Sequence, residues 1–82
     1  MKVKITKEDW TQLDYTEGTV KVVGAADVSV LFQTSDLKPE TDTGIIINAY
    51  EAPRIFSANG KKVWAKQIKG GYCVLECDMG FF

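Results

Sequence analysis

The stretch VSVLFQT, residues 28–34, decides how this chain folds. Its side chains alternate with the two-residue period of a β-strand that is buried on one side. One face carries Val28, Val30 and Phe32. The opposite face carries Ser29, Leu31 and Gln33. We therefore expect residues 28–34 to form a strand with these two sets of side chains on its opposite faces.

Short extended segments of the same kind lie on both sides of this strand. Turn residues separate them at intervals of about 8 to 12 residues, and no segment carries a sustained helical stripe. Further strands are expected at residues 2–6, 10–15, 19–23, 45–47, 61–68 and 72–78. The sequence thus predicts an all-β protein, a small antiparallel β-sandwich or barrel of about seven short strands. Residues 1–82 form a single domain, because a chain of this length supports one core.

The connections between these strands are marked by glycine, proline and asparagine. The segments 10–15 and 19–23 flank a turn signal and are expected to pair as a hairpin. Asn59-Gly60 is the strongest turn signal, because both residues tolerate the positive φ values of a type I′ turn. Pro53 cannot donate to a sheet ladder, so residues 50–58 form either a crossing connection or a ragged edge strand.

Two further expectations concern the inside of the protein. Ile45-Ile46-Ile47 is too short for a helix and is interpreted as a buried strand. In the last strand Cys73, Leu75 and Cys77 share one face, which is the inward face if Tyr72, Val74 and Glu76 face outward, and the inverse assignment is the alternative. The Cα atoms of the two cysteines lie roughly 13 Å apart in an extended strand, and a disulfide needs them within about 7 Å. We therefore expect two buried thiols that do not pair with each other.

Charge and hydropathy narrow the possible partners. The net charge is −1 and the pI is about 5.3, so nucleic acid is an unlikely partner by composition. No apolar run approaches the roughly 18 to 20 residues of a membrane span, and residues 1–5 alternate unlike a signal peptide. The chain is therefore expected to be made in the cytoplasm, with no membrane partner. Its thin core favours a homo-oligomer.

The residues needed for common catalytic chemistry are missing. The sequence has no histidine, the commonest general base and zinc ligand. Acidic neighbours of Cys77 would raise the pKa of that thiol, which disfavours a nucleophile. The long polar loop 35–44 holds Asp36, Glu40 and Asp42, but their spacing matches no calcium motif. We expect no enzyme, no cofactor and no metal site.

Two groups of side chains carry alternative interpretations. Trp10, Tyr50 and Trp64 form either a stacking platform for a glycan or part of the core, and we favour the core. Four lysines concentrate near Trp64 and Tyr72, and they suit either a nucleic-acid track or protection of an edge strand. Of these two, we favour edge protection. These lysines are Lys61, Lys62, Lys66 and Lys69.

The segment 79–82, Met-Gly-Phe-Phe, is a short apolar tail. Apolar residues at such a position either fold back on the domain or dock on a neighbouring molecule. We regard Met79, Phe81 and Phe82, together with Trp64, as candidate interface residues.

Several segments together resemble a family of small bacteriophage virion β-sandwich proteins, of the kind found in tails, tail-fibre anchors or head decoration. The segments are 9–13 (DWTQL), 18–22 (GTVKV), 28–32 (VSVLF) and 62–66 (KVWAK). The resemblance implies a structural role in the virion, with self-association, often as a trimer, and docking to other virion proteins. It carries no catalytic residue, because the shared motif consists of packing residues. The Cys73, Cys77 and aromatic end of this chain departs from the family pattern.

Two functions from different classes follow. The first is a phage structural and assembly protein, made in the host cytoplasm and located in the virion. The second is a small carbohydrate-binding or ligand-binding β-sandwich module that uses Trp10, Tyr50 and Trp64.

Overall fold

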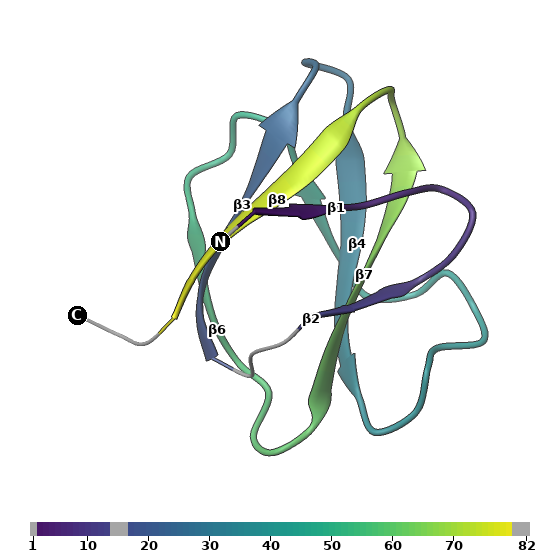
Figure 1. The fold of residues 1–82 in the computed structure, drawn as a ribbon, viewed down its shortest axis with the longest axis vertical. Coiled ribbons are helices and arrows are strands. Elements are labelled where there is room, and N and C mark those ends of the chain that lie inside the picture. Colours follow the sequence, from purple (N-terminus) through teal and green to yellow (C-terminus); the bar gives the residue numbers. More distant parts are fainter. Residues whose placement is uncertain (1, 14–16, 80–82) are drawn as a thin grey trace.

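The structure, a computed structural model, describes residues 2–13 and 17–79. In this part of the chain the regular elements are strands, and they form two four-stranded antiparallel sheets (Figure 1). The strands are β1 (Lys2–Lys4), β2 (Thr11–Leu13), β3 (Glu17–Gly24), β4 (Ser29–Ser35), β5 (Ile45–Asn48), β6 (Arg54–Ser57), β7 (Lys62–Lys69) and β8 (Cys73–Met79). The prediction of a small all-β sandwich is confirmed. The eighth strand is β6, which follows Pro53 at the edge of its sheet.

The strand orders are β1-β8-β3-β6 in the first sheet and β2-β7-β4-β5 in the second. Only β4 and β5 are both consecutive in sequence and paired, so most connections in the described chain cross from one sheet to the other. The predicted hairpin of 10–15 with 19–23 is therefore wrong. β2 pairs with β7, and β3 pairs with β8 and β6. Side-chain alternation shows which residues share a face, but it does not say which strand completes the ladder.

The core lies between the two sheets, because each strand turns its apolar face toward the other sheet. Val30 and Phe32 of β4 share one face, as the alternation predicted, and this face points inward, as do Val20 and Val22 of β3. In β8 the inward face is formed by Cys73, Leu75 and Cys77, the first of the two assignments that the sequence allowed. Burial raises the pKa of the Cys73 thiol.

The turn at Asn59-Gly60 has the predicted backbone conformation. The φ angles are 52° and 86°, and the Lys61 amide donates to the Ala58 carbonyl at 3.0 Å. The turn joins β6 of one sheet to β7 of the other, so it closes a crossing between layers and not a hairpin.

The expectation that the Ile45-Ile46-Ile47 strand is buried is correct only for Ile47. β5 is an edge strand, and Ile45 and Ile46 are 54% and 51% exposed. A strand at the edge of a sheet has a neighbour on one side only, so its side chains lack half of the cover that a central strand provides.

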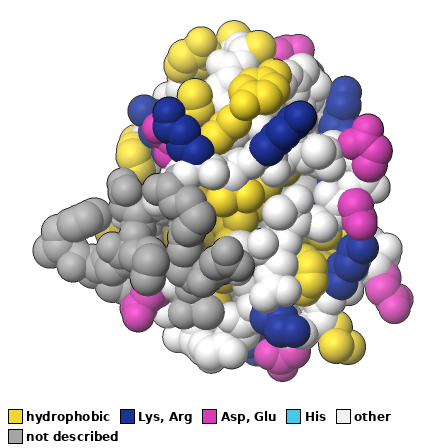
Figure 2. Space-filling model, in the orientation of Figure 1, with side chains coloured by type: hydrophobic (Ala, Val, Ile, Leu, Met, Phe, Trp, Pro, Cys, Tyr) yellow, Lys and Arg dark blue, Asp and Glu magenta, His cyan; other side chains and the backbone are white. Residues whose placement is uncertain are grey.

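The explanation of the lysines as edge protection is also wrong. β7 lies between β2 and β4, so lysines on it guard no edge. Lys66 instead forms an ion pair with Asp42 at 2.7 Å. On the face shown in Figure 2, basic and acidic side chains are interspersed and not gathered by sign.

Candidate interaction groove

Trp10 and Trp64 belong to a small second core on the outer face of the β2-β7-β4-β5 sheet. They pack with Leu31, and each tryptophan is only 8% exposed. The Trp64 Nε1–H donates to the Ser35 carbonyl at 3.1 Å, which satisfies the polar edge of that ring. The interpretation of these two tryptophans as packing residues agrees with their burial.

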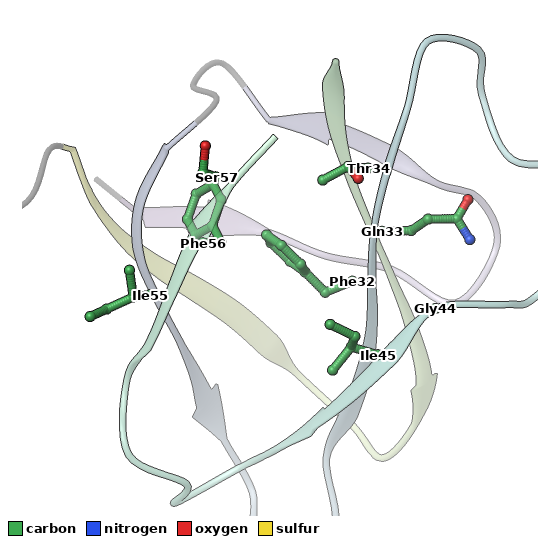
Figure 3. Close-up of a pocket in the computed structure, with 8 residues that line it drawn as sticks. All are labelled: Phe32, Gln33, Thr34, Gly44, Ile45, Ile55, Phe56 and Ser57. Carbon is green, nitrogen blue, oxygen red and sulfur yellow. The ribbon is translucent and has the colours of Figure 1, made fainter. Parts of the chain in front are cut away.

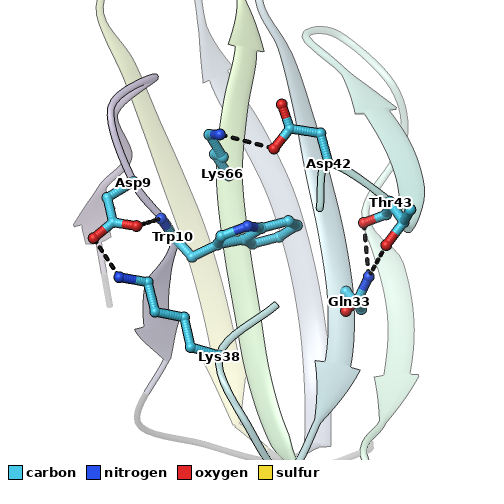
Figure 4. A network of polar contacts seen from close by, with 7 residues as sticks. All are labelled: Asp9, Trp10, Gln33, Lys38, Asp42, Thr43 and Lys66. Carbon is cyan, nitrogen blue, oxygen red and sulfur yellow. Dashed lines mark hydrogen bonds and ion pairs between the residues drawn. The ribbon is translucent and has the colours of Figure 1, made fainter. Parts of the chain in front are cut away.

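Polar contacts tie two loops over this second core (Figure 4). Lys38 pairs with Asp9, whose other carboxylate oxygen accepts from the Trp10 amide at 2.9 Å. The Lys38 contact, and then the Trp10 hydrogen bond, lower the pKa of Asp9 below its ordinary value. Gln33 Nε2 donates to the carbonyl and the hydroxyl of Thr43 at 2.8 and 2.7 Å. The acidic loop 35–44 is thus attached to the sheet at several points.

Asp42, one of the three acidic residues of this loop, is engaged with Lys66. Among the side chains that the structure describes, no group of three or more from His, Cys, Asp or Glu is arranged to hold a metal ion.

Tyr50 does not join the two tryptophans, and the interpretation of Tyr50 as a core residue is wrong. It is 76% exposed, with a φ of 69°, and it borders a shallow hollow of about 270 Å³ beside Lys21, Val23 and Glu76. The structure therefore brings together two of the three residues of the predicted stacking platform, and it buries those two.

An apolar groove of about 460 Å³ opens between the two sheets, where the edge strands β5 and β6 lie (Figure 3). At its centre the rings of Phe32 and Phe56 meet edge to face, with centroids 5.0 Å apart. The lining residues are Phe32, Gln33, Thr34, Gly44, Ile45, Ile55, Phe56 and Ser57.

Two exposed isoleucines, Ile45 and Ile55, line this groove, and a third, Ile46, lies next to it in β5. Ile45 stands opposite Phe32 in the ladder and so shares its inward face, whereas Ile46 points to the outer face with Leu31. Ile55 on β6 is 72% exposed. Exposed apolar side chains that adjoin one another are typical of an interaction surface.

The four edge strands differ in their protection. β1 carries Lys2 and Lys4, and β6 follows Pro53 and begins with Arg54, which are the usual devices against edge-to-edge pairing. β2 has only three residues. β5 has the sequence Ile-Ile-Ile-Asn, with neither charge nor proline. Among the described strands, β5 is therefore the edge best suited to accept another strand.

This groove was not predicted from the sequence. A run of three isoleucines fits a buried central strand as well as an exposed edge, and the strand order that separates the two cases depends on distant residues. Of the predicted interface residues, Trp64 lies under the loops of the second core. Phe81 and Phe82, and the side chain of Met79, lie outside the described part of the chain.

No helix in the described residues is long and apolar enough to cross a membrane. Comparison of the chain with protein-family models, with curated proteins and with solved structures found no match.

Proposed function

We propose that this chain is a non-catalytic assembly protein that associates with copies of itself and with other proteins through the groove between β5 and β6. The observation that carries the proposal is the apolar opening at this edge, where Ile45, Ile46 and Ile55 are each more than half exposed. In an isolated domain these exposed side chains contribute no free energy of burial. They contribute it when a partner covers them.

The size of this surface favours assembly from many copies. Full burial of an isoleucine contributes about 1.5 to 3 kcal/mol, so three half-exposed ones supply only a few kcal/mol. Association costs on the order of 4 to 15 kcal/mol in lost motion, so this groove alone gives a weak contact. Weak contacts become effective when several act together in a repeated assembly.

A structural component of a bacteriophage particle is the specific setting that we propose. The segments that carry the resemblance supply strands β2, β3, β4 and β7 of the sandwich. In this role the chain forms a homo-oligomer, for which the resemblance favours a trimer, and docks on other virion proteins in the virion.

Replacing Ile55 with lysine is expected to weaken self-association at least tenfold, because the new ammonium group would have to be desolvated in the contact. Light scattering over a concentration series measures the effect. Tyr72→Lys is the matched control, since Tyr72 is 69% exposed but lies beside β8, away from the groove. A chain that stays monomeric at every concentration, or equal effects of both variants, would contradict the proposal.

The alternative function is a small carbohydrate-binding or ligand-binding module, and one observation favours it: Tyr50 is exposed beside a hollow that also holds Lys21 and Glu76. An exposed ring next to polar groups suits a sugar face.

Tryptophan emission separates the two functions. Because Trp10 and Trp64 are each 8% exposed, we expect a glycan panel to leave the emission of the native protein unchanged. A Tyr50→Trp variant places a third indole in the exposed position as a reporter of the hollow. Quenching of this variant by a glycan would support the alternative, and an unchanged signal would exclude the glycans tested.

A further inference from the structure

We propose that β5 pairs with β5 of a second copy of this chain, antiparallel and around a twofold axis. The β2-β7-β4-β5 sheets of the two copies would then form one continuous eight-stranded sheet. This inference rests on the proposed function, because it names the partner and the geometry of the contact.

The backbone of β5 shows which groups are available for pairing. The Ala49 amide donates to the Val28 carbonyl at 3.0 Å, so Ala49 faces β4. Backbone groups alternate along an antiparallel strand, so Ile47 and Ile45 also face β4, whereas Asn48 and Ile46 face away from it. Within the described chain, no protein group bonds the outward N–H and C=O of Ile46.

At the end of β5, the backbone N–H and C=O of Asn48 already have hydrogen-bond partners within the chain. The Asn48 amide donates to a carboxylate oxygen of Glu51, and the Asn48 carbonyl accepts from the Glu51 amide at 3.4 Å. The Asn48 amide, and then Arg54, hold the pKa of Glu51 below its ordinary value. The available edge therefore begins at Ile46 and extends back toward Gly44.

This limit fixes the register of the pairing. With the twofold axis at Ile45, the Ile46 amide of each copy donates to the carbonyl of Gly44, the residue just before β5, in the other copy. The two Ile45 residues then form the close pair between those bonds, with Cα atoms about 4.5 Å apart. With the axis at Ile46, Gly44 would instead lie opposite Asn48, whose backbone groups already bond to Glu51 and cannot pair.

The charge of this edge favours a second copy as the occupant. β5 has no charged residue, and the charges near its ends are balanced within each copy. Asp42 pairs with Lys66 at 2.7 Å, and Glu51 pairs with Arg54 at 3.1 Å. An antiparallel pair of identical strands thus brings no uncompensated like charges together, whereas a charged peptide would find no opposite charge along the strand.

The small area of the contact also suits a second copy of the chain. β5 has four residues, of which Ile45 and Ile46 are exposed, so the contact is well below the roughly 800 Å² per partner of a standard interface. Such a contact is effective where a second copy is held at high local concentration by other contacts. Because the contact is twofold, it produces even-numbered species: dimers, or hexamers if a threefold contact also operates.

Cysteine cross-linking tests the register. Ile45→Cys should form a disulfide-linked dimer under mild oxidation, because the close pair satisfies disulfide geometry. Ile46→Cys is the matched control, since Ile46 is 51% exposed against 54% for Ile45. In the proposed register the Cα atoms of residue 46 in the two copies lie roughly 8 to 9 Å apart, beyond disulfide reach. We expect at least tenfold faster cross-linking of Ile45→Cys, and equal rates or the reverse order would overturn the pairing.

A proline variant tests the pairing without a new thiol. Ile46→Pro removes only an outward N–H, which edge strands tolerate, so the fold should persist while the even-numbered species is lost. Circular dichroism checks the fold, and sedimentation velocity measures the mass. A trimer that Ile46→Pro leaves unchanged, but Ile55→Lys dissociates, would overturn this inference and leave the proposed function standing. If the wild-type chain is monomeric throughout, both are wrong.

Discussion

Replacing Gly70 with alanine is expected to lower the free energy of unfolding by about 2 to 5 kcal/mol. Two costs combine at this turn between β7 and β8. The φ of Gly70 is 95°, in the left-handed region that disfavours any side chain. A Cβ atom there would lie 2.7 Å from both Cα and Cγ2 of Val28, closer than atoms can approach.

Val28 has little freedom to move away from the new methyl group. Its side chain is fully buried, its amide donates to Ala25 at 3.1 Å, and its carbonyl accepts from Ala49 at 3.0 Å. The contact must therefore be relieved by displacing the backbone of the turn, which also holds the Gln67 side chain. Gln67 Nε2 donates to the Gly70 carbonyl at 2.9 Å and to the Lys69 carbonyl at 3.1 Å.

Substitutions at two other glycines separate the cost of backbone strain from the cost of the contact with Val28. Gly60 has a φ of 86°, but beyond its two chain neighbours no residue has an atom within 4 Å of the position that a Cβ would take. Gly60→Ala should therefore cost only the backbone strain, about 1 to 2 kcal/mol. Gly71 has neither feature, and Gly71→Ala should change stability by about 1 kcal/mol or less. Urea unfolding measures all three variants. If Gly70→Ala lowered the free energy of unfolding no more than Gly60→Ala, the contact with Val28 would contribute nothing to the loss.

The fold class was predictable because burial imposes a period on each strand separately. The alternation in 28–34 placed Val30 and Phe32 on one face, that in the last strand placed Cys73, Leu75 and Cys77 on one face, and both sets are buried in the core. Strand partners were not predictable in this way. The pairing of β2 with β7 joins residues about fifty positions apart, and nothing in the local sequence of 10–15 records it.

The candidate groove was missed for the same reason. Whether Ile45 is covered depends on its place at the edge of a sheet, and that place is set by β4 and by the absence of a further described strand beyond β5. The tryptophans were easier to interpret, because large aromatic side chains in a small domain contribute most when buried. Their position on the outer face, under two loops, depends on contacts such as Asp9 with Lys38 that no sequence period encodes.

Replacing Leu75 with alanine is expected to lower the free energy of unfolding by about 2 to 5 kcal/mol. Leu75 has no exposed surface and lies on β8, with Val3 of β1 and Val22 of β3 beside it in the ladder. Removing its isobutyl group forfeits the burial of that group and leaves a cavity that the paired strands cannot close.

The loss is large for a domain of this size. At roughly 0.05 to 0.15 kcal/mol per residue, a chain of 82 residues has a total stability of about 4 to 12 kcal/mol. Leu75→Ala should therefore lower the melting temperature by about 10 °C or more, and in the lower part of that range it leaves a substantial unfolded fraction at 25 °C.

Val74→Ala is the matched control for this change. Val74 is the preceding residue of the same strand, but it faces away from the core and is only partly buried, so its truncation should cost about 1 kcal/mol or less. Thermal unfolding at several protein concentrations measures both variants and separates the loss of the core from any loss of association, since only the latter depends on concentration. Similar losses for the two variants would mean that the inward and outward faces of β8 do not differ as the sandwich requires.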